Sequence, residues 1–208
     1  MASASTSSIQ RQKYDYFLVL DFEATCDNKS KLNQNEIIEF PVLKISGRTF
    51  ECESIFHTYV TPTLNRQLTE FCTELTGITQ NDVTNQPILS DVLQNFEEWL
   101  RKEYLLNPKV NFIFVTCGDW DLFTMLPGQC TYFNLQRAAY FDRWINIKKS
   151  FKKVTGKFAN SGMMGMLNDL HIQHQGRHHS GIDDCKNIAA ILKALAERGH
   201  VFEENRKK

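Results

Sequence analysis

Residues 14–26 read YDYFLVLDFEATC, a nearly continuous apolar and aromatic run that ends in two carboxylates. A run of this kind is typical of a β-strand that is buried on both faces. Asp21 and Glu23 are two positions apart, so in a strand their side chains point to the same face. Two acids this close raise each other's pKa unless a cation lies between them. The stretch therefore predicts a strand whose carboxyl end holds a metal, with a solvated strand end as the alternative.

The rest of the chain favours one mixed α/β domain. Further strands are predicted at residues 37–46, 49–60, 111–116 and 144–147, and helices at residues 68–75, 88–102, 162–170 and 184–198. A helix-like stretch follows residue 121 and is expected to stop at Pro127. The first three strands are joined by short links that suit an antiparallel meander. We expect a mixed five-stranded sheet flanked by α-helices.

The length and composition fit one domain with a sizeable core. The chain has 208 residues, of which 42% are hydrophobic. We expect a disordered tail at residues 1–13, a domain at residues 14–203 and a frayed end at residues 204–208. Lys and Arg together number 24 and so do Asp and Glu, so the formal net charge is zero. A domain that coats duplex DNA is usually basic, which makes that class a poor fit.

The cysteine spacing and the lack of long apolar segments indicate where in the cell the protein is expected. The six cysteines form no CxxC pair, which favours reduced thiols. No segment reaches the ~18 apolar residues that a membrane helix needs. The first dozen residues also lack the apolar core of a secretory signal. We expect an intracellular protein, cytoplasmic or nuclear or both, without a membrane partner.

Two further clusters with acidic residues follow or precede predicted elements. Asp121 and its neighbour Asp119 come after the strand at residues 111–116, where a turn or helix N-cap is the simpler role. Residues 177–184 read RHHSGIDD and directly precede a helix. One of Asp183 and Asp184 could be the N-cap, and the other could face the site from the first turn.

These clusters together predict more than each one alone. Four acids can hold two metal ions that act on the attacking and leaving oxygens of a phosphoryl displacement. A histidine titrates near neutral pH and can take a proton from an attacking water. The combination favours metal-assisted hydrolysis of phosphodiesters.

The motifs resemble a known family. The order Asp-x-Glu, then Asp, then His-x4-Asp is similar to the DEDDh 3′–5′ exonucleases, which have the RNase H-like fold. The stretches YDYFLVLDFEATC, EIIEFPV, FCTELTGIT, WINIKKS and HSGIDDCKNIA resemble the Eri-type exoribonuclease branch of that family. The resemblance covers nearly the whole chain.

The resemblance assigns roles to the acidic and histidine positions. It implies that two Mg²⁺ or Mn²⁺ ions are held by four acids, Asp21, Glu23, Asp121 and Asp184. It places the acid of the second motif at Asp121 rather than at Asp119. His179 is implied to be the general base, with His178 a bystander.

The resemblance also implies a pocket for the terminal nucleotide. Backbone around Phe22, Ala24 and Thr25 would approach the terminal phosphate and sugar. Leu75, Thr76 and Trp120 would meet the sugar and base, and core packing is the alternative for Leu75 and Trp120.

The implied substrate is a single-stranded RNA 3′ end, and the implied product is a 5′-nucleoside monophosphate. An exonuclease that prefers DNA and an RNA-binding scaffold without activity are the alternatives. The basic residues 148–153 could contact the phosphate backbone or simply form a solvated face.

Overall fold

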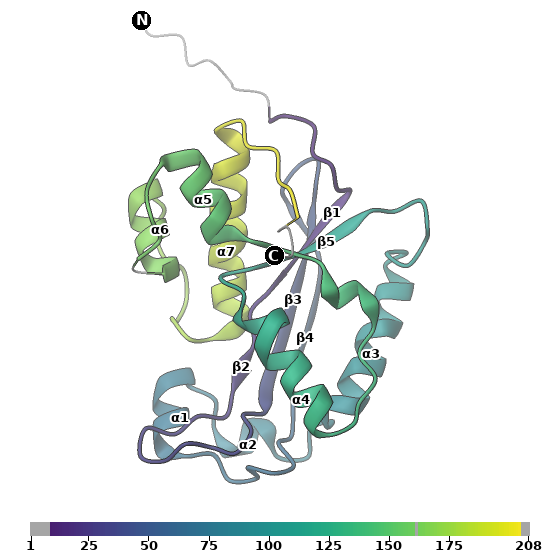
Figure 1. Cartoon of the computed structure of the whole chain (residues 1–208), viewed down its shortest axis with the longest axis vertical. Helices are drawn as coiled ribbons and strands as arrows, with labels where there is room; N and C mark the ends of the chain where they lie inside the picture. Colours follow the sequence, from purple (N-terminus) through teal and green to yellow (C-terminus); the bar gives the residue numbers. More distant parts are fainter. Residues whose placement is uncertain (1–8, 161, 205–208) are drawn as a thin grey trace, which may run out of the picture.

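The computed structural model describes residues 9–160 and 162–204 (Figure 1). The elements in chain order are β1 (Tyr16–Leu20), β2 (Glu23–Ala24), β3 (Ile37–Ser46), β4 (Cys52–Tyr59), α1 (Glu70–Thr76), α2 (Gln80–Val83), α3 (Leu89–Lys102), β5 (Phe112–Thr116), the π-helix η1 (Trp120–Met125), α4 (Leu126–Tyr132), the 3-10 helix η2 (Ala139–Asp142), β6 (Trp144–Asn146), α5 (Ile147–Thr155), α6 (Gly162–Leu170) and α7 (Gly181–Glu197). In this part of the chain no helix combines the length and apolar character needed to span a membrane.

One mixed sheet of six strands forms the centre of the molecule. The strand order is β2-β3-β1-β5-β6, and β4 pairs with β3. β3 is antiparallel to β1, β2 and β4, whereas β1, β5 and β6 run parallel to one another. The expected mixed sheet with flanking helices is confirmed. It has six strands instead of five because the first expected strand is divided into β1 and β2.

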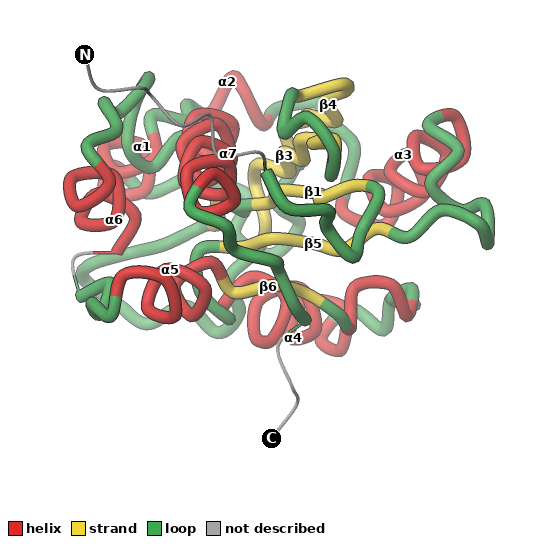
Figure 2. The backbone as a smooth tube through the Cα atoms, turned by 90° about the horizontal axis from the view of Figure 1, so that it is seen from above, coloured by secondary structure: helices red, strands yellow, loops and turns green. Residues whose placement is uncertain are grey.

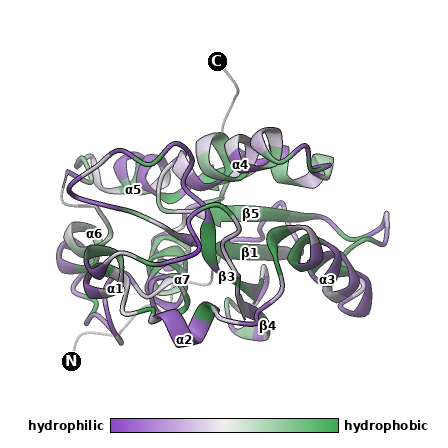
Figure 3. Cartoon of the chain, turned by 90° about the horizontal axis from the view of Figure 1, so that it is seen from below, coloured by the Kyte–Doolittle hydropathy of each residue, from purple (hydrophilic) through white to green (hydrophobic). Residues whose placement is uncertain are grey.

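Helices cover both faces of the sheet. Figures 1 and 2 show α5, α6 and α7 on one side and α3 and α4 on the other. The sheet has a hydrophobic core on each face, and alternate residues of β1 contribute to the two cores. Phe17 and Val19 pack under α7, and Leu18 and Leu20 pack toward α3. All four are fully buried, as expected for a strand without a solvent face. In Figure 3 the central strands are coloured as hydrophobic, while much of the outer surface of the helices is hydrophilic.

The helix after β5 differs from the expectation. Pro127 does not stop the helix: it lies in the first turn of α4, where its fixed φ suits the helix, and α4 continues directly from the π-helix η1. The helical segment therefore continues to Tyr132, and it begins with the π-helix η1. Helix α5 was not expected as a helix. It begins where the Asn146 side chain accepts the Lys148 N–H at 3.0 Å.

The two ends of the described chain contact each other. Residues 1–8 and 205–208 of the expected tail and frayed end lie outside the described residues. The Gln12 side chain donates to the His200 carbonyl at 3.1 Å and accepts the Phe202 N–H at 3.1 Å. Ile9 packs against the core under α7. Residues 9–13 therefore lie along the C-terminal segment.

Candidate active site

The first pair of acids lies where the sheet changes register. β1 and β2 both pair with β3, and residues Asp21 and Phe22 separate them. A β-bulge at Glu23 marks the change of register. Phe22 is anchored by an edge-to-face contact with Phe40, with 4.7 Å between ring centroids. This break projects Asp21 and Glu23 from the carboxyl end of the central strand.

The third acid comes from η1. Asp121 is only 4% exposed, and its Oδ1 accepts the Phe22 N–H at 3.0 Å. Its neighbour Asp119 faces elsewhere, because it pairs with Lys149 at 3.1 Å and accepts the Trp144 indole N–H at 2.9 Å. A π-helical turn shifts side chains by one position relative to an α-helix, and such turns are frequent at functional sites. The structure thus brings Asp121, and not Asp119, to the first pair.

The fourth acid and the histidine lie at the start of α7. This helix begins at Gly181 with Ser180 as its N-cap residue, so the expectation that Asp183 or Asp184 caps it is wrong. Both aspartates lie in the first turn. Asp184 is 4% exposed and accepts the His179 N–H at 3.0 Å.

Glu39, which was not singled out from the sequence, fixes α7 to the sheet. Its carboxylate accepts the Gly181 N–H at 2.9 Å and the Ile182 N–H at 3.1 Å, and it lies 2.8 Å from His57 Nε2. Position 181 needs glycine, since a Cβ there would lie 2.7 Å from the backbone oxygen of Asp21. In the sequence, the one feature that could have pointed to Glu39 was the presence of an acid inside the apolar strand predicted at residues 37–46. Glu39 therefore sets the distance between Asp184 and the first acid pair.

The carboxylates strongly perturb one another. Burial raises the pKa of Asp21 well above its ordinary value, and the charges of Asp121 and Glu23 raise it further. Burial and the facing charge of Glu39 raise the pKa of Glu23 to about 9. Burial raises the pKa of Asp121 to about 6. The pKa of Asp184 is raised by burial as well. Clustered charges with raised pKa values are typical of functional sites.

Nearby cations offset this charge only in part. Lys148 lowers the pKa of Asp121, and Arg177 lowers that of Glu23, yet both remain raised. The donors are carboxylate oxygens, the type that Mg²⁺ and Mn²⁺ prefer. The four acids therefore fit the divalent metal ions that the family implies.

Removing one charge is expected to stabilise the metal-free protein. For Asp21→Asn we expect the free energy of unfolding at pH 8 to rise by about 1 kcal/mol or more. The folded state raises the pKa of Asp21, so its ionised form weakens folding increasingly as the pH rises above about 4. Urea unfolding with chelator measures the change.

The same titration with Mg²⁺ or Mn²⁺ provides the control. Either ion should stabilise the wild type more than Asp21→Asn, because binding to the folded state raises its stability. Equal unfolding midpoints for both proteins under both conditions would contradict the account of charge repulsion.

His179 adopts an uncommon backbone conformation. Its φ is 64°, in the left-handed region, and a nitrogen of its ring lies within 4.8 Å of carboxylate oxygens of Glu23 and Asp184. Burial and the neighbouring charge of His178 lower the pKa of His179. A lowered pKa keeps the imidazole neutral, the form that can accept a proton.

Four of the expected nucleotide-binding residues lie within two positions of the acids in the sequence: Phe22, Ala24, Thr25 and Trp120. Phe22, Ala24 and Thr25 are buried around the bulge, and the Thr25 hydroxyl accepts the Glu36 N–H at 2.9 Å. Trp120 is 46% exposed, so core packing does not account for its position. These placements leave the Trp120 ring available to a ligand.

Arg177 draws the end of α1 toward the start of α7. Its guanidinium donates to the backbone oxygens of Glu74 and Leu75 and lies against Gly77. Leu75 is partly buried, and Thr76 is buried with its hydroxyl donated to a backbone oxygen of α1. This contact holds the C-terminal end of α1, with Leu75 and Thr76, against the loop that carries His179.

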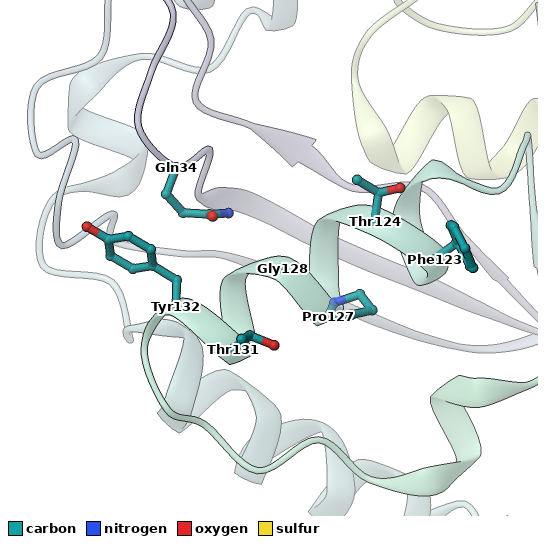
Figure 4. Close-up of a pocket in the computed structure, with 7 residues that line it drawn as sticks. All are labelled: Gln34, Phe123, Thr124, Pro127, Gly128, Thr131 and Tyr132. Carbon is teal, nitrogen blue, oxygen red and sulfur yellow. The ribbon is translucent and has the colours of Figure 1, made fainter.

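A shallow groove continues from η1 along α4. Its volume is about 610 Å³, and Figure 4 shows Phe123 and Tyr132 toward its two ends with Gln34 on the facing segment. Phe123 is 72% exposed and Tyr132 is 51% exposed. The groove begins two residues from Asp121 in sequence.

Comparisons with known proteins agree with this geometry. A family model described as Exonuclease matches residues 18–192. ERI1 exoribonuclease 3 of Homo sapiens is 56% identical over 204 residues, covering 98% of this chain and 60% of the relative. The chain therefore spans about three-fifths of the length of that relative.

Two solved structures are also similar. The nuclease domain of 3′hExo, a DEDDh family member bound to rAMP, has a TM-score of 0.90 at 35% identity, covering 96% of this chain and all of that one. A 3′-exonuclease solved for recognition of the histone mRNA stem-loop has a TM-score of 0.89 at 35% identity, covering 95% of this chain and 68% of that one.

Proposed function

Because this chain belongs to the exonuclease family, whose model matches residues 18–192, we propose that it is a 3′–5′ exoribonuclease acting on single-stranded RNA ends. One observation carries the proposal: four buried or partly buried acids and His179 meet at the carboxyl end of the central strand. The similar relative is named an exoribonuclease, and the similar nuclease domain is bound to rAMP. Both support RNA as the substrate.

The acids would hold the metal ions of the reaction. Asp21, Glu23, Asp121 and Asp184 would bind two Mg²⁺ or Mn²⁺. Such ions, when bound, neutralise the carboxylates, activate water and stabilise charge on the phosphate. The hydrogen bond from the Phe22 N–H to Asp121 keeps that acid oriented toward the first pair.

His179 would move the proton. Its neutral imidazole accepts a proton from the water that attacks the terminal phosphorus. The bond from phosphorus to the 3′ oxygen of the preceding nucleotide breaks, and that oxygen takes up a proton. The products are a 5′-nucleoside monophosphate and an RNA that is one nucleotide shorter with a free 3′ hydroxyl.

Exposed aromatic and apolar groups would hold the terminal base. We expect Trp120→Ala to raise KM about tenfold with a smaller change in kcat, because stacking of a base on an aromatic ring contributes ~1–3 kcal/mol. Tyr104 is 77% exposed and lies at the far end of α3, so Tyr104→Asn is the control and should keep the wild-type KM. Equal KM values for all three proteins would remove Trp120 from the binding site.

The decisive experiment uses a 5′-labelled single-stranded RNA with a free 3′ hydroxyl, beside a DNA of the same sequence. Reactions contain Mg²⁺, Mn²⁺ or chelator. A ladder that shortens from the 3′ end of the RNA, and is lost with chelator, supports the proposal. Faster shortening of DNA would favour the DNA exonuclease. Tight RNA binding without cleavage by a folded protein would favour the scaffold.

The cysteines support an intracellular location. The structure has all six as free thiols, three of them buried. We propose a reducing compartment, cytoplasmic or nuclear or both. Fractionation of cells that express the chain tests this.

A further inference from the structure

A second group of possible metal ligands lies beside the acids, where the loop that joins α6 to α7 meets the first turn of α7. His174, His178 and Asp184 each offer one donor atom, and the three atoms lie within 4.8 Å of one another. We propose that these residues bind a transition-metal ion of the Zn²⁺ type, and that such an ion competes with the hard divalent ions for Asp184.

The donor atoms are already close to metal-binding geometry. His178 Nδ1 lies 3.3 Å from Asp184 Oδ2. Two ligands of a tetrahedral zinc ion are separated by about 3.3 Å, given bonds of ~2.0 Å. The His174 and His178 rings are 6.2 Å apart and nearly perpendicular, at 82°. Both rings thus face one small volume next to the carboxylate.

His174 has a nitrogen that the protein leaves without a partner. Its Nε2 is fully enclosed by protein atoms and makes no hydrogen bond with the described residues. A buried polar atom in this state costs ~1–3 kcal/mol, and such atoms call for an explanation in a native structure. Coordination of a metal ion by Nε2 would give this atom the partner that the described residues do not supply.

The loop is held firmly against α7. The buried Asn187 side chain accepts the Gln175 N–H at 3.0 Å and donates to the Gln175 oxygen at 2.8 Å. Asp183 accepts the Arg177 N–H at 3.1 Å. These bonds flank His174 and His178 and fix the backbone that carries them. The site therefore needs little reorganisation to bind an ion.

The donor types separate this site from the four-acid cluster. Two imidazoles and one carboxylate, with water as fourth ligand, form a common zinc arrangement. Mg²⁺ prefers oxygen ligands, which the four acids offer. Asp184 belongs to both sets, so an ion bound by the histidines draws this carboxylate away from the acids.

The direct test uses Co²⁺ as a probe for Zn²⁺, because tetrahedral Co²⁺ absorbs visible light. Co²⁺ is titrated into the wild-type protein in excess Mg²⁺, and Zn²⁺ is then added to displace it. We expect His174→Ala to weaken Co²⁺ binding at least about tenfold. Unchanged affinity in that variant would overturn the proposal.

Two further variants make the assignment specific. His171 is exposed and lies three residues before His174, so His171→Asn should bind Co²⁺ as the wild type does. His179→Asn removes the other possible set, formed by Glu23, His179 and Asp184, and should also keep the absorption band. Loss of the band only in His179→Asn would move the ion to that other set and reject our proposal. Circular dichroism verifies the fold of each variant.

The competition for Asp184 rests on the proposed nuclease function and has its own readout. Micromolar Zn²⁺ added to Mg²⁺-supported RNA shortening should inhibit the wild type more strongly than His174→Ala. Equal inhibition of the two proteins would reject competition through this site. If no RNA is shortened at all, the nuclease proposal fails, while the Co²⁺ titration still decides whether the metal site exists.

Discussion

Asp184→Asn is expected to reduce RNA shortening by at least about 10³-fold while the protein stays folded. The change removes one charge from the four-acid cluster but keeps the shape of the side chain. The amide oxygen can still accept the His179 N–H, so the start of α7 should be preserved. Single-turnover rates on the labelled RNA in Mg²⁺ measure the effect, and thermal unfolding verifies the fold.

Asp183→Asn is the matched control. Asp183 lies in the same helical turn but is bonded to Lys186 and to the Arg177 N–H, away from the acids. We expect its rate to stay within about twofold of wild type, as for most surface substitutions. If Asp184→Asn retains full activity, or if both variants lose it equally, the assignment of Asp184 is wrong.

His179→Asn is expected to lower the rate by about 10²- to 10⁴-fold, the usual contribution of a general base. Asparagine suits this position because it tolerates a φ of 64°, where alanine would add strain. His171 has a φ of 58° and is exposed, so His171→Asn repeats the same exchange outside the site and should keep the wild-type rate.

The pH dependence tests the same role independently. Only the neutral imidazole accepts a proton, so the wild-type rate should rise with pH as His179 deprotonates. Burial and the charge of His178 lower the pKa of His179, which places this rise below the ordinary range for histidine. If the rate of His179→Asn depends on pH as the wild-type rate does, a group other than His179 causes the rise.

The fold was largely predictable because its main strands carry strong local signals. The apolar run of β1 and the alternation in β4 indicate strands in any context. The break between β1 and β2 was missed because both lie in one apolar run, and only the register of β3 separates them. The continuation of the helix past Pro127 was missed because proline occurs at the start of a helix as readily as after its end.

The acids of the site could be predicted from the sequence, but the residues that hold them in place could not. The motif positions of Asp21, Glu23, Asp121 and Asp184 followed from a family resemblance, and the structure brings them together. Glu39 was missed because its role depends on α7, which approaches β3 only in three dimensions. Long-range contacts of this type leave no periodic pattern in the sequence.

The bond between Glu39 and Gly181 joins residues that are 142 positions apart in the sequence. During synthesis the ribosome releases the chain from its N-terminus, at ~5–20 residues per second. Asp21, Glu23 and Asp121 therefore emerge well before Asp184, which completes the set only when α7 docks on β3. A nascent chain therefore cannot complete the four-acid cluster until α7 has been synthesised and has docked on β3.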